Sequence, residues 1–233
     1  MSNPRAAAAA LAYEEIKRRI VECEYLPGAK LSEARLADEL GFGRSPVRTA
    51  FSRLQAEGWI AVNPQSGTYV RVPTEREIHD IFETRLLLEA HVTRTAARSM
   101  DPEALARLRA DFRRLAPRGR EPGPRAVEAF NRLDSLFHGA IYRAAGNDLV
   151  TSILVNLLEK ARWLKNAFPS PPKRWKVAFA EIERVLECLE AHDAGGAARL
   201  MREHIGNAAD VAEFERRRLA AGGKRRPARG KTS

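Results

Sequence analysis

A very short turn between two amphipathic segments is the feature of this sequence that most restricts its fold. Residues 33–40 and 45–57 each carry apolar side chains at helical spacing, and only residues 41–44, which include two glycines, separate them. Ser32 can cap the first segment, and Pro46 suits the first turn of the second because its missing N–H has no helical partner there. The pattern therefore predicts two short helices that cross at a steep angle, as in a helix-turn-helix unit.

The flanking segments complete a small DNA-binding type of domain. An amphipathic helix is expected over 8–24, before the pair. After the pair come two β-rich runs, 59–62 and 68–72, joined by the Asn/Pro/Gly-containing segment 63–67, which is the pattern of a hairpin. Three helices followed by a hairpin predict a winged helix-turn-helix domain over 1–73.

The rest of the ordered sequence is purely helical in pattern. No strand-like alternation follows Pro73, and breaks rich in Pro, Gly, Asn or Asp separate the helical stretches. The predicted helices lie near 75–99, 102–116, 125–145, 147–166, 173–193 and 195–219. The predicted fold is therefore mainly α, with a winged helix-turn-helix followed by an all-α bundle of about six helices over 74–215.

The net charge of +10 says less about function than its location does. Residues 1–73 carry 10 basic and 8 acidic side chains, and residues 74–215 carry 22 of each, so both regions are close to neutral. Residues 216–233 hold eight basic side chains, no acidic ones and few apolar groups, which predicts a disordered basic tail that either aids solubility or touches phosphates. Evidence for DNA binding must therefore come from residue spacing.

Several classes of protein are excluded by composition. No apolar run approaches the ~18 residues of a membrane span, and the N-terminal segment has no secretory signal pattern. The two cysteines, Cys23 and Cys188, lie 165 positions apart, which is neither a disulfide framework nor a zinc motif. We expect a cytoplasmic protein with no membrane partner.

The segment 45–57 has the residues that a recognition helix needs. Polar side chains lie opposite its apolar stripe and gather near its N-terminus: Arg44, Ser45, Arg48, Thr49 and Ser52. An arginine such as Arg48 can bind guanine through two hydrogen bonds. The alternative is an ordinary amphipathic surface helix. The hairpin predicted after this segment favours the recognition helix over that alternative.

Two runs carry a family resemblance. Tyr25-Leu26-Pro27-Gly28-x-x-Leu31-Ser32-Glu33-x-x-Leu36-Ala37-x-x-Leu40-Gly41 and Arg44-Ser45-Pro46-Val47-Arg48-x-Ala50-x-x-Arg53-Leu54-x-x-Glu57-Gly58 resemble the winged helix of GntR-family bacterial transcriptional regulators. The resemblance implies that Arg44, Ser45 and Arg48 contact DNA and that Gly67 lets the wing tip approach the minor groove. Gly43 and Ala34 replace residues that supply further DNA contacts in that family, which implies an altered affinity or operator preference.

The second domain contains polar residues inside apolar helical stripes. Asp134 and His138 lie four positions apart on one face of the 125–145 helix, and His204 interrupts the stripe of the last helix. Arg85 and Glu89 interrupt the stripe of the 75–99 helix in the same way. Because burying a charge without a partner costs several kcal/mol, these side chains must meet one another, a metal or a ligand.

The same domain is similar to the FCD type of ligand-binding domain, found in the FadR-like branch of the GntR family. The similarity covers about residues 76–214 and rests on Arg85-x-x-x-Glu89 with Ala96-Ala97, on Asp134-x-x-Phe137-His138 followed by Gly146-Asn147, and on Asp193-x-x-x-Ala197 with Met201-x-x-His204-Ile205. It implies an effector-binding and dimerisation domain. It also implies a divalent metal held by one Asp and three His, of which Asp134, His138 and His204 supply three.

The fourth metal ligand of the family is absent. Ile182 stands at its position, and its neighbours Glu181 and Glu183 are each rotated about 100° around the helix from it. The remaining three residues could bind Zn, Mn or Ni completed by water or an effector carboxylate, or they could form a hydrogen-bonded polar cavity without metal. Arg85 could bind an anionic effector or simply pair with Glu89.

The sequence thus predicts a transcriptional regulator and not an enzyme. It is expected to bind a double-stranded DNA operator as a homodimer, to respond to a small organic effector such as a carboxylate, and to repress transcription, the commoner mode in the family. Two other hypotheses stay open. One is a metal-dependent hydrolase that uses Asp134, His138 and His204, although no general base stands out beside them. The other is a sequence-blind nucleic-acid binder driven by the basic tail.

Overall fold

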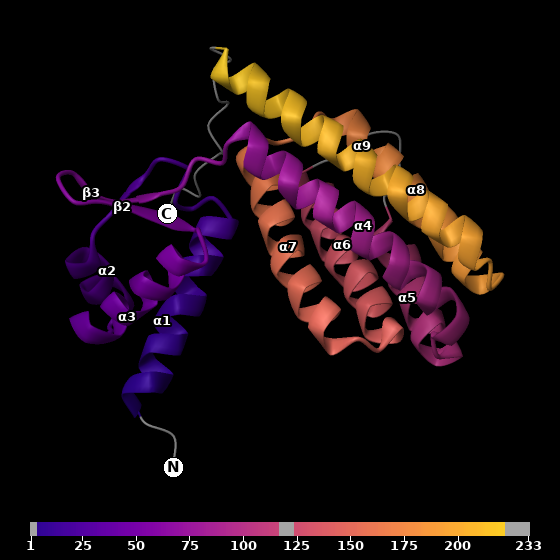
Figure 1. Ribbon diagram of the computed structural model, residues 1–233, viewed down its shortest axis with the longest axis horizontal. Helices are drawn as coiled ribbons and strands as arrows, with labels where there is room; N and C mark the ends of the chain where they lie inside the picture. The colour runs from indigo at the N-terminus through magenta and orange to yellow at the C-terminus, as the bar shows by residue number, and fades with distance from the viewer. Residues whose placement is uncertain (1–3, 117–123, 222–233) are drawn as a thin grey trace. The chain divides into compact units, whose positions relative to one another are not determined.

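The computed structural model describes residues 4–116 and 124–221. The chain divides into two compact units, with the division between Thr74 and Glu75. Each unit has its own set of packed elements, most of which are labelled in Figure 1.

The first unit combines three helices with a small sheet. Its elements in chain order are α1 (Pro4–Val21), β1 (Lys30–Leu31), α2 (Glu33–Leu40), α3 (Arg44–Ala56), β2 (Ile60–Asn63) and β3 (Gly67–Val70). The strands are antiparallel in the order β1-β3-β2, with Lys30 opposite Tyr69 and Ala61 opposite Tyr69 on the other side. The predicted hairpin is β2–β3, and β1 is an additional strand that we did not predict.

Local chemistry sets the geometry of the turn between α2 and α3. The side chain of Ser32 accepts a hydrogen bond from the backbone N–H of Arg35 and caps α2. Gly41 ends α2 with φ 69°, a left-handed conformation that favours glycine. Gly43 is the residue before α3 and offers no side chain to cap it. The buried face of α3, which includes Val47 and Leu54, then packs against α1.

The second unit is a bundle whose described residues form six helices. They are α4 (Glu75–Ser99), α5 (Pro102–Leu115), α6 (Pro124–Ala145), α7 (Asp148–Ala167), α8 (Pro172–Glu190) and α9 (Ala194–Ala220). Helix α4 packs along α9, α6 and α7, as the paired ribbons of α4 and α9 in Figure 1 illustrate. The predicted fold class, a winged helix-turn-helix followed by a helical bundle, is confirmed.

Hydrogen bonds between helix ends fix the helix directions. Ser99 at the end of α4 bonds the carbonyl of Ala144 at the end of α6, so these two helices run in parallel. Arg216 near the end of α9 pairs with Glu75 at the start of α4, so α9 runs the opposite way. The two-residue link between α6 and α7 reverses the chain, as does the short link between α7 and α8. Helices α4, α6 and α8 therefore run one way, and α7 and α9 run the other.

The prediction of a disordered basic tail is wrong for its first residues, 216–220. Helix α9 continues to Ala220, so Arg216, Arg217 and Arg218 are helical and not part of a disordered segment. Acidic partners explain the difference, because Arg216 pairs with Glu75 at 2.9 Å and Arg218 pairs with an acidic residue one turn back in α9 at 2.6 Å. The rest of the predicted tail, 222–233, lies outside the described residues. Among the helices of the described residues, none has the length and apolarity that a membrane crossing requires.

Candidate functional site

Helix α3 presents the predicted DNA-contacting side chains to solvent. Every one of them is exposed: Arg44, Ser45, Arg48, Thr49 and Ser52. The hydroxyl of Thr49 donates to the carbonyl of Ser45, and that of Ser52 donates to the carbonyl of Arg48, each at 3.1 Å. These bonds orient the hydroxyl oxygens on the open face of the helix. Contact of these side chains with DNA stays a prediction.

Arg48 has a neighbour that the spacing of α3 alone did not reveal. Its Nε lies 3.2 Å from Oε2 of Glu33 at the start of α2, although the Arg48 side chain is 73% exposed. An exposed ion pair of this kind contributes little stability. Its effect is positional, because it restrains the guanidinium of Arg48 on the side of α3 that faces α2.

The wing tip is shaped around Gly67. This residue has φ 113°, a conformation that side-chain-bearing residues rarely adopt. A Cβ at this position would lie 3.0 Å from Cε of Lys30, so the absence of a side chain also leaves room for that lysine. The ammonium of Lys30 lies 5.9 Å from the centre of the Tyr69 ring. Lys30 belongs to the strand that sequence analysis missed, and it adds a positive charge beside the predicted wing contact.

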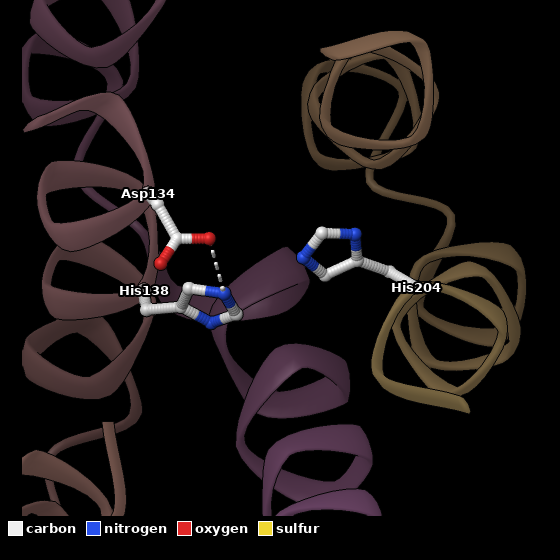
Figure 2. Close-up of side chains that lie close together, drawn as sticks. All are labelled: Asp134, His138 and His204. Atoms are coloured by element: carbon white, nitrogen blue, oxygen red, sulfur yellow. Dashed lines mark ion pairs between the residues drawn. The ribbon is translucent and has the colours of Figure 1, made fainter. Parts of the chain in front are cut away.

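In the second unit, three polar side chains from two helices meet in the interior. Asp134 and His138 come from α6 and His204 from α9, and one possible ligand atom from each lies within 4.8 Å of the others. Figure 2 shows a ring nitrogen of His204 pointing across the gap toward the other two side chains. All three are buried, and the two imidazole rings stack with centroids 5.6 Å apart. The structure therefore brings together the three residues that the sequence predicts as metal ligands.

Each of the three side chains contacts a charged partner on the side that faces away from the other two. Nδ1 of His138 lies 2.6 Å from Oε2 of Glu89 on α4, and Nδ1 of His204 lies 2.8 Å from Oε2 of Glu181 on α8. Asp134 contacts Lys165 on α7 through Oδ2 at 2.6 Å, while its Oδ1 lies 3.7 Å from Nε2 of His138. Nε2 of both histidines and Oδ1 of Asp134 are thus the atoms left for the shared centre.

This donor set fits a divalent metal ion. Metal-bound histidines characteristically have a carboxylate or carbonyl on the other ring nitrogen, and both imidazoles here have one. Neither ring nitrogen of His138 makes a hydrogen bond of good geometry in the described part of the chain, but Nδ1 lies 2.6 Å from the Glu89 carboxylate and Nε2 lies 3.7 Å from that of Asp134, so Nε2 is the nitrogen open to a ligand. Ile182 is completely buried and offers no donor, so the described residues supply three protein ligands here and leave the other positions of the ion open.

Two members of the cluster were not predicted. Sequence analysis judged Glu181 a poor substitute for the missing ligand, and the structure places it behind His204, where it bonds Nδ1. Its Oε1 also accepts from Asn207, and both of its oxygens accept from Arg174. Lys165 carried no distinguishing signal, because its partner lies on another helix.

Burial and charge set opposite protonation tendencies for the two histidines. Burial lowers the pKa of His138, but Glu89 and Asp134 outweigh it and the pKa is raised overall. Burial also lowers the pKa of His204, and there its effect prevails over Glu181. Burial opposes ionisation of Glu89, yet Arg85 and His138 lower its pKa to about 2. The carboxylates of the cluster therefore stay charged.

A cavity of about 40 Å³ adjoins this cluster and is lined by Arg85, Asp134, Lys165 and His204 among others. Arg85 is 3% exposed, and its Nε donates to Oε1 of Glu89 at 2.6 Å. Its two Nη groups have no hydrogen-bond partner among the described residues. Pairing with Glu89 and binding an anion, the two roles considered for Arg85, are thus compatible because they use different nitrogens.

Comparison with known proteins identifies the family. Residues 8–70 match the model of the gntR family of bacterial regulatory proteins, and residues 80–207 match the model of the FCD domain. The chain belongs to the GntR family of transcriptional regulators, in its FCD branch. The resemblance seen in the sequence is confirmed. GntR-family proteins are transcription factors and not enzymes, so the hydrolase hypothesis has no support from the comparisons.

Curated relatives match this chain over most of its length. The chain is 26% identical over 198 residues to the HTH-type transcriptional repressor RspR of Escherichia coli (strain K12), with 83% of each protein covered. It is 28% identical to the HTH-type transcriptional regulator LutR of Bacillus subtilis (strain 168), covering 81% of this chain and 93% of LutR. Among GntR-like solved structures, E. coli McbR/YncC matches with a TM-score of 0.75 at 21% identity, over 91% of this chain and 98% of that one, which supports the fold.

Proposed function

We propose that this GntR-family protein is an effector-responsive repressor that binds an operator in double-stranded DNA as a homodimer in the cytoplasm. The observation that carries the proposal is that one chain holds both an exposed recognition helix and, in a separate unit, a buried charged cavity. A ligand that binds the cavity differently in the DNA-competent and DNA-incompetent states shifts the balance between them. Relatives named as repressors, RspR among them, support the sign of the regulation.

The DNA contacts are assigned to α3 and the wing. Arg48 reads a base edge, Arg44 and the α3 hydroxyls position the helix on phosphates, and Gly67 allows close approach of the wing. Exposure of all these groups, and the restraint of Arg48 by Glu33, support the assignment. Symmetric half-sites one helical turn of DNA apart are expected for a dimer.

The effector is assigned to the cavity in the bundle. The free Nη groups of Arg85 suit a carboxylate, which they can bind through two parallel hydrogen bonds. Asp134, His138 and His204 hold one divalent ion, with Zn, Mn and Ni as the candidates. Such an ion would supply Lewis-acid binding of the same effector carboxylate at its open positions.

The DNA assignment is tested with Arg48→Ala in a gel-shift or footprinting assay against an operator selected from random DNA. We expect loss of discrimination between operator and unrelated DNA, about 5- to 150-fold, with weak salt-sensitive binding retained. Arg76→Ala is the matched control, because Arg76 is an exposed arginine of the second unit that pairs with Asp80 in the same helix. Unchanged specificity in Arg48→Ala would show that α3 is not the reading element.

The metal assignment is tested by elemental analysis of protein purified without chelators. We expect at most one divalent ion per chain and its loss in the Asp134→Ala/His138→Ala double variant. Stoichiometric metal that survives in the double variant would place the ion elsewhere. A protein that binds no metal under any condition would leave the alternative of a metal-free polar cavity.

A further inference from the structure

The cavity beside the polar cluster is layered along the bundle axis. Because α4 and α6 run in the same direction, Phe82, one turn before Arg85, and Phe130, one turn before Asp134, lie toward the same end. Helix α9 runs the opposite way, so Val211, two turns after His204, lies toward that end as well. A charged layer is therefore followed by an apolar layer on every one of these helices.

The apolar layer is largely aromatic. Phe130 and Trp175 meet edge to face with ring centroids 4.8 Å apart, and both line the cavity. Phe168 and Val211 line it from α7's end and α9, together with alanines of α8 and α9. The polar lining residues at this end are Ser170, which has a hydroxyl, and Arg174, which is paired with Glu181.

The basic side chains that line the cavity are paired with carboxylates, but the two Nη groups of one of them are not. Three basic side chains line it, and Arg174 gives both of its Nη groups to Glu181 at 3.0 and 2.9 Å. Lys165 lies 2.6 Å from Asp134. Arg85 alone among the three keeps both Nη groups without a protein partner in the described part of the chain, while only its Nε is bonded.

We propose that the cavity takes an organic acid with one carboxylate and an apolar body, the carboxylate on Arg85 and the body against Phe130 and Trp175. This inference rests on the proposed effector-binding function and adds the class of effector. In the metal-free protein a second carboxylate would find no unmatched cation. A polyhydroxylated body would place most of its hydroxyls against apolar side chains, with Ser170 as the one lining hydroxyl at that end, and unpaired hydroxyls weaken binding.

The proposal is tested by calorimetric titration of the full chain, with and without Zn²⁺. The small cavity makes short acids the right probes: acetate, propionate and butyrate, with glycerate, succinate and butyramide as polar, dianionic and neutral counterparts. We expect the affinity to rise about fourfold for each added CH₂ that becomes buried. Without metal, glycerate and succinate should bind at least tenfold more weakly than butyrate, and butyramide should not bind measurably.

Two variants locate the apolar body. Phe130→Leu keeps the site filled and is expected to fold, and Phe130→Ala should flatten the dependence on chain length while acetate still binds. Phe214→Ala is the matched control, because Phe214 is 64% exposed on α9 and does not line the cavity. Its dependence on chain length should equal that of the unmodified protein.

The outcomes separate this inference from the proposed function. Tighter binding of glycerate or succinate than of butyrate to the metal-free protein would overturn the apolar-acid assignment while leaving an effector cavity in place. Equal affinity for acetate, propionate and butyrate, or an unaltered series in Phe130→Ala, would do the same. Failure of every probe to bind, with or without metal, would count against the effector function itself and against this inference with it.

Discussion

Replacement of Glu89 by glutamine is the most direct test of how the buried charges of the bundle depend on one another. Glu89 is fully buried, with Oε1 2.6 Å from Nε of Arg85 and Oε2 2.6 Å from Nδ1 of His138. Gln preserves the size of the side chain but removes its charge, which leaves the guanidinium of Arg85 buried without a counter-ion. Removing one member of a buried pair costs about 3–5 kcal/mol.

That cost is large enough to measure in the second unit. For a domain of this size each kcal/mol corresponds to about 2–4 °C in Tm, so Glu89→Gln should lower the Tm of that unit by about 6–20 °C. Calorimetry is the assay of choice, because the two units can unfold in separate transitions and only one should move. Glu83→Gln, an exposed position of the same helix, is the control and should change stability by no more than about 0.5 kcal/mol.

A double variant identifies the origin of the loss. In Arg85→Gln/Glu89→Gln the unmatched cation is gone as well, so part of the lost stability should return relative to Glu89→Gln alone. If Glu89→Gln were as stable as Glu83→Gln, the interior of the bundle would tolerate an unmatched Arg85, and the reasoning from buried charge would be wrong.

Three further outcomes are expected. Glu33→Gln should weaken operator binding by less than tenfold, because it frees Arg48 without removing it, and an unchanged operator affinity in gel shifts would show that the pair has no positional role. Tyr13→Phe should cost about 1 kcal/mol at neutral pH through loss of the hydrogen bond to Glu57. Burial and that bond raise the pKa of Tyr13 to about 12 from its ordinary 10. The resulting contribution to the free energy of unfolding is therefore complete below pH 10 and is lost as the pH rises to 12. Urea titrations should show this alkaline loss of stability in the parent protein and not in Tyr13→Phe. Removal of 222–233, which contains five of the eight basic residues of the predicted tail, should reduce the salt dependence of binding and preserve operator affinity, and near-total loss of binding would favour the sequence-blind hypothesis.

Helical periodicity carried most of what could be predicted. The spacing of apolar side chains gave the helices of both units and showed that Arg48 lies on the exposed face of its helix, since three-to-four-residue recurrence determines a face without any tertiary information. The same periodicity showed that Asp134 and His138 are polar residues on the apolar, buried face of their helix. His204 was recognised because a polar side chain in an apolar stripe must find a partner.

Contacts between helices were beyond the reach of the sequence. Lys165 and Glu181 lie behind the predicted ligands, and nothing in the spacing of their own helices says which neighbour they face. Strand β1, Lys30–Leu31, was missed because two residues cannot show an alternating pattern and depend entirely on pairing with β3. Residues 216–219 fell both in the last predicted helix and in the predicted basic tail, and the helix prevails there because Arg216 has an acidic partner 141 positions earlier in the chain.

The layering of the cavity has an evolutionary consequence. The ion pairs that hold the bundle together and the aromatic side chains one turn away occupy different positions of the same helices, so either set can change while the other is kept. Substitution of Phe130 or Trp175 alters the space beyond Arg85 and leaves Glu89 and its partners intact. A gene duplicate of this regulator could therefore acquire a new inducer through conservative changes at a few apolar positions that leave these ion pairs in place.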